Sequence, residues 1–160
     1  MKMIVVAILI SACAFGQTPT PAACGPAGVE FKIAKDKSQH PTPTPANGKA
    51  VVYLLGEGTI GLDGKWVGAV HDGDYSELEI DAGEHHLCSA LATPIPVIFL
   101  LWKKMHFASV HSLTAEAGRI YYFQSYGAQR PWGDFTLRQL DPDEGARMVS
   151  GATFSTSHPR

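Results

Sequence analysis

The chain has 160 residues, of which 45% are hydrophobic and 18% charged, and its formal net charge is -2. This composition excludes a disordered chain, and the length suits a single domain. Thirteen basic residues against fifteen acidic ones predict no nucleic-acid partner, because domains that bind nucleic acid carry a basic surface. The sequence contains no stretch of about 20 consecutive apolar residues, so we expect no transmembrane span in the mature chain.

The N-terminus has the features of a secretory signal peptide. Lys2 provides a positive charge, and Met3–Ile10 is an unbroken apolar run. The small side chains in Ala14-Phe15-Gly16 stand where a signal peptidase reads. Cleavage after Gly16 would remove residues 1–16, and the mature protein would be periplasmic or secreted.

Two other interpretations of the N-terminus stay open. Ile10-Ser11-Ala12-Cys13 has the form of a lipobox, in which Cys13 is acylated and the chain becomes a membrane-anchored lipoprotein. Stable attachment would then need more than a single acyl chain. The apolar run, rich in β-branched residues, is also compatible with a buried N-terminal strand.

The cysteine count points to one disulfide. Of three cysteines, Cys24 and Cys88 remain after removal of residues 1–16. Two cysteines in an exported chain usually pair, so we predict a Cys24–Cys88 disulfide that ties the N-terminal segment to the domain. Unpaired thiols are one alternative. A Cys–His dyad of Cys88 with His86, which would share its strand face, is another.

Residues 17–47 are predicted to be a Pro-rich segment with one possible strand. Apolar and charged residues alternate between Gly28 and Ala34, as in a half-buried strand. His40 to Ala46 has a proline at every second position, which forbids a helix and favours an extended spacer.

Residues 48–150 are predicted to form the domain itself. Residues 50–55 are apolar at every position, as expected of a central strand. Asp63-Gly64 predicts a tight hairpin turn, because both positions of a type I′ turn require a positive φ. We expect strands at 50–55, 59–62, 65–70, 75–80, 84–91, 118–126 and 135–140.

One short helix follows the last of these strands. Asp141 can cap it, Pro142 suits its first position, and Glu144 suits a capping box, so we expect about two turns ending near Ser150. The tail, residues 151–160, either adds an edge strand or stays loose. The predicted fold is mainly β, an antiparallel sandwich of about 7–8 strands with one short C-terminal helix.

From Gly48 onward the sequence resembles the bacterial family described as domain of unknown function 2846, which is similar to small PEGA-type β-sandwich modules. The matching stretches are KAVVYLL, IGLDGKWVGAV, YSELEIDAGEHHLC, LTAEAGRIYYF and LRQLDPDEGARM, with Arg119 where a lysine is common. The resemblance spans roughly residues 48–150 and implies an exported or cell-envelope protein with an antiparallel β domain. It provides no catalytic residue to transfer.

The sequence contains no recognisable catalytic constellation or cofactor motif. We therefore expect no cofactor and a non-enzymatic module with a binding or structural role, although an enzyme is not excluded. The alternative is a metal-dependent hydrolase that uses histidines of the β domain. Neighbouring histidines in a strand point to opposite faces, so we assign no metal site from sequence. The candidate histidines are His71, His85, His86, His106 and His111.

Two surfaces are candidates for binding an unknown envelope component or protein partner. Residues 94–104 combine an apolar run with Lys103-Lys104, and its two prolines make a central strand a poor expectation. We expect a hydrophobic loop that contacts lipid or a partner, or a loop that folds over an open end of the sandwich. Its contact residues would be Ile95, Val97, Phe99, Leu101 and Trp102. The aromatic residues of the second surface, more typical of a core, are Tyr121, Tyr122, Phe123, Tyr126 and Trp132.

Overall fold

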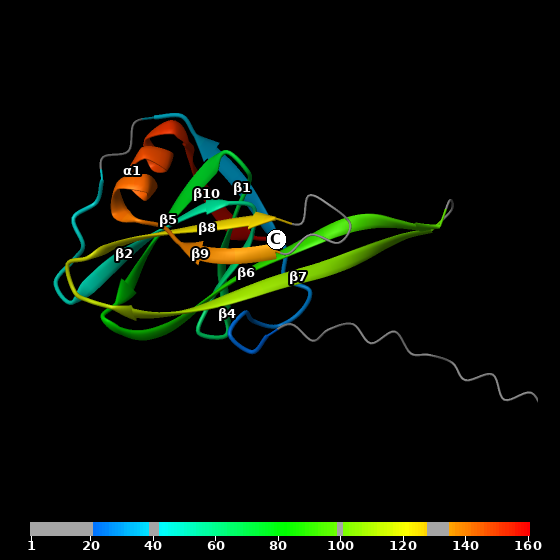
Figure 1. Cartoon of the computed structure of the whole chain (residues 1–160), viewed down its shortest axis with the longest axis horizontal. Coiled ribbons are helices and arrows are strands. Elements are labelled where there is room, and N and C mark those ends of the chain that lie inside the picture. The colour runs from blue at the N-terminus through cyan, green and yellow to red at the C-terminus, as the bar shows by residue number, and fades with distance from the viewer. Residues whose placement is uncertain (1–20, 39–41, 99–100, 128–134) are drawn as a thin grey trace, which may run out of the picture.

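The computed structural model describes residues 21–38, 42–98, 101–127 and 135–160, with the backbone alone for residues 93–98 and 101–105. The described residues form two sheets and one helix (Figure 1). The six-stranded sheet has the order β1-β10-β5-β2-β8-β9, and the four-stranded sheet has the order β4-β3-β6-β7. The elements are β1 (Phe31–Asp36), β2 (Lys49–Gly56), β3 (Gly58–Leu62), β4 (Lys65–Val70), β5 (Asp74–Asp81), β6 (Gly83–Ile98), β7 (Leu101–Ala115), β8 (Ile120–Gly127), β9 (Phe135–Gln139), α1 (Pro142–Gly151) and β10 (Thr153–Pro159).

The main hydrophobic core lies between the two sheets. Strand β2 runs through the middle of the larger sheet, antiparallel to β5 and parallel to β8. Because successive side chains alternate between faces, β2 contributes Ala50, Val52 and Leu54 to this core. Phe123 of β8 is its largest fully buried side chain. The predicted central strand is therefore confirmed.

The other face of β2 lies under α1. Val51, Tyr53 and Leu55 belong to a second apolar cluster, which also includes Met148 and Val149 of the helix. Residues 50–55 of β2 are all apolar because both faces of the strand are buried, one by the smaller sheet and the other by α1.

The local signals for turn and helix are confirmed. Asp63 and Gly64 have φ angles of 49° and 81°, as the predicted hairpin turn between β3 and β4 requires. The Asp141 side chain accepts a hydrogen bond from the Asp143 amide at 2.9 Å, and Pro142 begins α1. The capping box predicted for Glu144 is not confirmed, because its carboxylate accepts from Arg138 at 3.1 Å.

The predicted sandwich is correct in outline but not in detail. The described residues hold ten strands, not seven or eight, because β7 escaped the sequence patterns and the tail, left open as an edge strand or a loose segment, forms β10. Strand β10 lies between β1 and β5 and not at the edge of the sheet. The larger sheet is mixed rather than antiparallel, since β2–β8 and β10–β5 are parallel pairs. Strands β1 and β10 pair with each other and join the larger sheet through β5, so the sheet extends beyond residues 48–150 in both directions.

The sole helix among the described residues, α1, has ten residues. This helix is not long and apolar enough to cross a bilayer.

Candidate functional site

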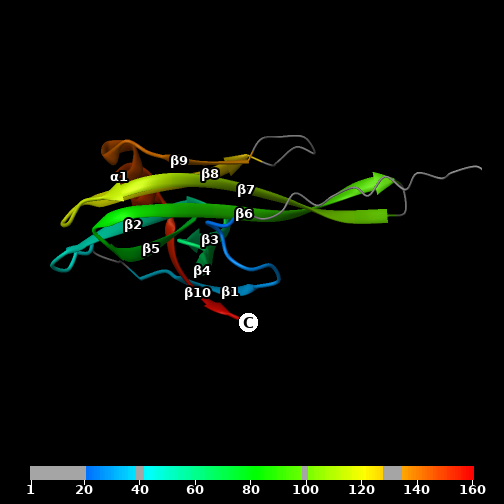
Figure 2. The ribbon, with the colours of Figure 1, turned by 90° about the horizontal axis from the view of Figure 1, so that it is seen from below.

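The most prominent feature of the molecule is a long hairpin of β6 and β7 that extends away from the other strands (Figures 1 and 2). Strand β6 pairs with β3 only from Leu87 to Ala90, whereas its pairing with β7 continues to Ile98. Beyond Ala90, within the described part of the chain, β7 is the one strand that pairs with β6. Eight further residues of strand extend about 27 Å at 3.4 Å per residue. We call residues 93–98 and 101–105 the arm.

The arm contains the apolar run that the sequence analysis selected. Ile95 and Val97 lie on β6, and Leu101 and Trp102 lie on β7. Lys103 pairs with Ile95, and Lys104 pairs with Pro94. The fifth predicted contact residue, Phe99, lies outside the described residues.

The expected loop at residues 94–104 is wrong, because the arm is a strand pair. A proline cannot donate a ladder hydrogen bond and is tolerated at a sheet edge. Pro94 and Pro96 lie in the part of β6 that has one strand neighbour, so their nitrogens can face away from β7 without breaking the pairing. The objection to a central strand does not apply to this edge.

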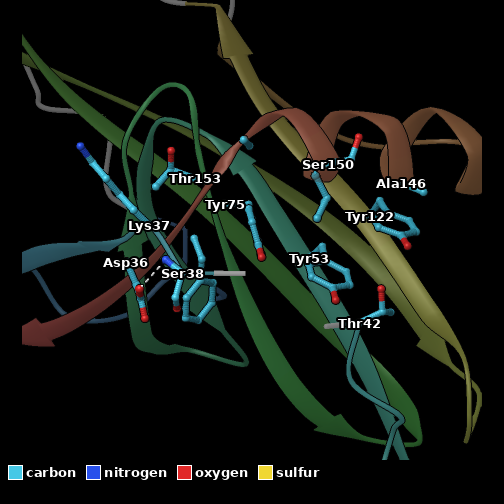
Figure 3. Close-up of a pocket in the computed structure, with 13 residues that line it drawn as sticks. Asp36, Lys37, Ser38, Thr42, Tyr53, Tyr75, Tyr122, Ala146, Ser150 and Thr153 are labelled. Atoms are coloured by element: carbon cyan, nitrogen blue, oxygen red, sulfur yellow. Dashed lines mark hydrogen bonds between the residues drawn. The ribbon is translucent and has the colours of Figure 1, made fainter. Parts of the chain in front are cut away.

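A second candidate site is a cavity of about 690 Å³ beside α1 (Figure 3). Its wall is formed by tyrosines from three strands of the larger sheet, and hydroxyl-bearing residues lie around them. Figure 3 shows the hydroxyl ends of Tyr53 and Tyr122 on the side where Thr42 lies. The lining residues are Asp36, Lys37, Ser38, Thr42, Tyr53, Tyr75, Tyr122, Ala146, Val149, Ser150, Ala152, Thr153 and Phe154.

The tyrosines of this cavity pack on one another and are largely buried. The rings of Tyr53 and Tyr122 are stacked, with centroids 5.2 Å apart and an interplanar angle of 8°. The Tyr75 ring is tilted against Tyr53 at 5.7 Å. Burial, with smaller effects of Glu77 and the two other tyrosines, raises the pKa of Tyr53 to about 12, although a hydrogen bond with Thr42 acts in the opposite direction. These phenols are therefore neutral at physiological pH and offer hydroxyl groups, not charge.

The predicted aromatic group divides between the two faces of the larger sheet. Phe123 is fully buried between the sheets, Tyr122 lines the cavity, and Trp132 lies outside the described residues. Sequence reasoning did not select Tyr53 and Tyr75 as partners of Tyr122. The alternation of side chains along β2 could have identified Tyr53, because the odd-numbered residues of β2 lie on the face opposite the main core.

The histidines of the hydrolase alternative do not come together in the described part of the chain. No group of three or more His, Cys, Asp or Glu side chains there is arranged to hold a metal ion. His111 packs edge-on against the Phe123 ring at 5.0 Å. The Cys–His dyad is excluded, because Cys88 carries no free thiol.

Cys24 and Cys88 form the predicted disulfide. Both residues are completely buried, and Gly61, which pairs with Cys88 across the sheet, has no side chain to obstruct the Cys24 backbone. Two hydrogen bonds to backbone carbonyls lie beside the disulfide. Gly64 donates to the Ala23 carbonyl at 3.0 Å, and the indole N–H of Trp66 donates to the Pro26 carbonyl at 2.6 Å. The segment after residue 20 is thereby held against β3, β4 and β6.

His85 is held by two acceptors at the base of the β6–β7 hairpin. Its Nδ1 lies 2.7 Å from a carboxylate oxygen of Asp63, and its Nε2 lies 2.9 Å from the Asp81 carbonyl. The hydrogen bond with Asp63 raises the pKa of His85 above its ordinary value of 6.5, although burial acts in the opposite direction. Burial also acts to raise the pKa of Asp63, but the hydrogen bonds from His85 and His86 outweigh it and lower that pKa.

We predict that Asp63→Asn lowers the pKa of His85, because it removes the carboxylate that stabilises the imidazolium. Asparagine tolerates the positive φ at this position and keeps an acceptor for the His86 amide, which donates to Asp63 at 2.8 Å. In the wild type the contribution of His85 to stability is fully present below pH 6.5 and is lost as the pH rises through the raised value. NMR titration of the ring protons measures the change.

The control for this titration is Asp72→Asn, which alters a carboxylate in a different turn and should leave His85 unchanged. A wild-type His85 that titrates at or below 6.5, or one that does not respond to Asp63→Asn, contradicts the prediction.

Comparison of the chain with protein-family models, with curated proteins and with solved structures finds no match. The resemblance to domain of unknown function 2846 therefore stays a prediction from the motifs alone.

Proposed function

We propose that this chain is an exported, non-enzymatic β-sandwich module that binds a component of the cell envelope through the arm. The observation that carries the proposal is the arm itself. A hairpin that continues for eight residues past its last contact with β3 adds nothing to the pairing of the sandwich. An apolar sequence in such a place is typical of a contact surface.

The disulfide supports the export part of the proposal. Disulfides persist in secreted and periplasmic proteins and are rare in the reducing cytosol. The Cys24–Cys88 bond agrees with the signal-like sequence of residues 1–16, which lie outside the described residues. Both processing routes, cleavage after Gly16 and acylation of Cys13, lead out of the cytosol.

The lipoprotein route is compatible with an arm that reaches a membrane. Cys24 is bonded to Cys88, which lies ten residues before Ile98, or about 34 Å of strand. The eleven residues from Cys13 to Cys24 span at most about 36–40 Å when extended. An acylated Cys13 and the end of the arm can therefore contact the same bilayer.

The test is the distribution of the protein between soluble and envelope fractions. The full chain is expressed with its own N-terminus in a bacterial host, in a Cys13→Ala background that removes any lipid anchor. Mass spectrometry identifies the first residue of the mature protein. We expect the chain in the envelope fraction, and we expect Ile98→Ser/Leu101→Ser to shift it to the soluble fraction.

The matched control places two serines on the body of the domain instead. Val67 and Val110 are exposed hydrophobic residues outside the arm, so Val67→Ser/Val110→Ser should leave the distribution unchanged. Equal urea midpoints for the wild type and the arm variant would show that the sandwich folds without the apolar end. An arm variant that stays with the envelope like the wild type would refute the proposed role of the arm.

A further inference from the structure

We propose that the arm binds an anionic phospholipid surface by shallow insertion of its end, an inference that rests on the proposed function above and names its partner.

The apolar end of the arm has the depth of a membrane interface. The last pairs are Ile98 with Leu101 and Pro96 with Trp102, and the next pair brings Lys103 opposite Ile95. Three residue steps separate Leu101 from Lys104, which is about 10 Å of strand. Interfacial elements insert about 5–10 Å, whereas the hydrocarbon core is about 30 Å thick. The arm therefore fits the boundary between headgroups and acyl chains and is too short to span the bilayer.

The hairpin segment and the rest of the chain carry net charges of opposite sign. Residues 85–115 contain no Asp or Glu and two Lys, Lys103 and Lys104. The other residues hold the remaining eleven Lys and Arg and all fifteen Asp and Glu, a net charge of -4 against +2 for the hairpin segment. An anionic surface attracts the hairpin and repels the body, so this distribution orients the molecule with the arm toward the lipid.

The order of residues in β7 matches the layers of such a surface. Leu101 is apolar, and Trp102 belongs to the residue type enriched at the membrane–water boundary. Lys103 and Lys104 follow directly. Lysine carries its ammonium on a flexible apolar stem that reaches from the hydrocarbon edge to headgroup phosphates. A site for a folded protein partner would not require this succession of apolar, interfacial and cationic residues.

The prolines lower the cost of placing an isolated strand pair near lipid. Backbone N–H groups without a partner are unfavourable away from water, and the edge of β6 beyond Ala90 faces no other described strand. Pro94 and Pro96 are two residues apart on β6, so their backbone nitrogens face the same edge of the strand, and neither has an N–H. They therefore remove two donors from the edge that would otherwise need a partner.

The experiment is a vesicle flotation assay with the disulfide-bonded chain from residue 17 onward. One set of vesicles is phosphatidylcholine alone, and the other contains phosphatidylcholine and phosphatidylglycerol in a molar ratio of about 3:1. We expect binding to the anionic vesicles that weakens as salt rises, because surface charge is screened. Lys103→Gln/Lys104→Gln should weaken that binding by roughly tenfold or more, and Ile98→Ser/Leu101→Ser should abolish it.

The matched control removes two lysines from the body. Lys32 and Lys65 are exposed, and Lys32→Gln/Lys65→Gln should change binding by less than about twofold. Absence of wild-type binding, or equal effects of the two double-lysine variants, would overturn the lipid inference. If vesicles fail to bind while envelope association still depends on the arm, the partner is a protein and the proposed function stands. If envelope association is independent of the arm, the proposed function itself is wrong.

Discussion

Replacing both Cys24 and Cys88 with alanine is expected to lower the free energy of unfolding by about 2–4 kcal/mol. The bond joins residues 64 apart in sequence, so its loss restores much conformational freedom to the unfolded chain. In the folded state it secures the first described segment against β3 and β6. Hydrogen bonds from Gly64 and Trp66 also hold that segment.

Urea unfolding measures this effect, with two comparisons that isolate the covalent bond. The wild type under reducing conditions should unfold near the midpoint of the double-alanine variant, because both lack the cross-link. Gly61→Ala should move the midpoint in the same direction, because a Cβ there would collide with the Cys24 backbone. A double-alanine variant within about 0.5 kcal/mol of the oxidised wild type would show that the bond contributes little.

Gly145→Ala is expected to destabilise the protein by about 1–3 kcal/mol, although alanine ordinarily favours a helix over glycine by about 1 kcal/mol. Gly145 is the buried residue of α1. A Cβ at this position would overlap the Tyr122 side chain at its Cβ and at ring atoms. Tyr122 cannot easily move aside, since its other face is stacked on Tyr53. Steric overlap therefore outweighs helix propensity at this site.

The matched control is Gly151→Ala at the end of the same helix, where a Cβ would meet nothing within 4 Å. This variant should be neutral or more stable by less than about 1 kcal/mol. Urea midpoints compare the two, and near-UV circular dichroism reports the displaced tyrosines. Equal gains in stability for both variants would contradict the close packing of α1 on β8.

The features that the sequence alone determined are those that depend on local conformation or on counting. The Asp63-Gly64 turn needs two positive φ angles, and few residue types adopt them readily. The Asp141 cap and Pro142 define the start of α1 through contacts within one turn. The disulfide followed from the two cysteines that remain after the predicted processing, and the central position of β2 followed from its unbroken apolar sequence.

The features that only the tertiary structure decided depend on neighbours far apart in the chain. Period-2 alternation shows that a residue is on a strand face but not which strand lies beside it, so the parallel pairs β2–β8 and β10–β5 were not predicted. The tyrosine cavity was missed for the same reason, since Tyr53, Tyr75 and Tyr122 come from three strands. The outer part of β6 was missed because Pro94 and Pro96, which argue against a central strand, are acceptable on an edge. Its partner β7 was missed with it. The arm exists because β6 continues past the last residue that pairs with β3. The sequence of one strand does not show where the neighbouring strand ends.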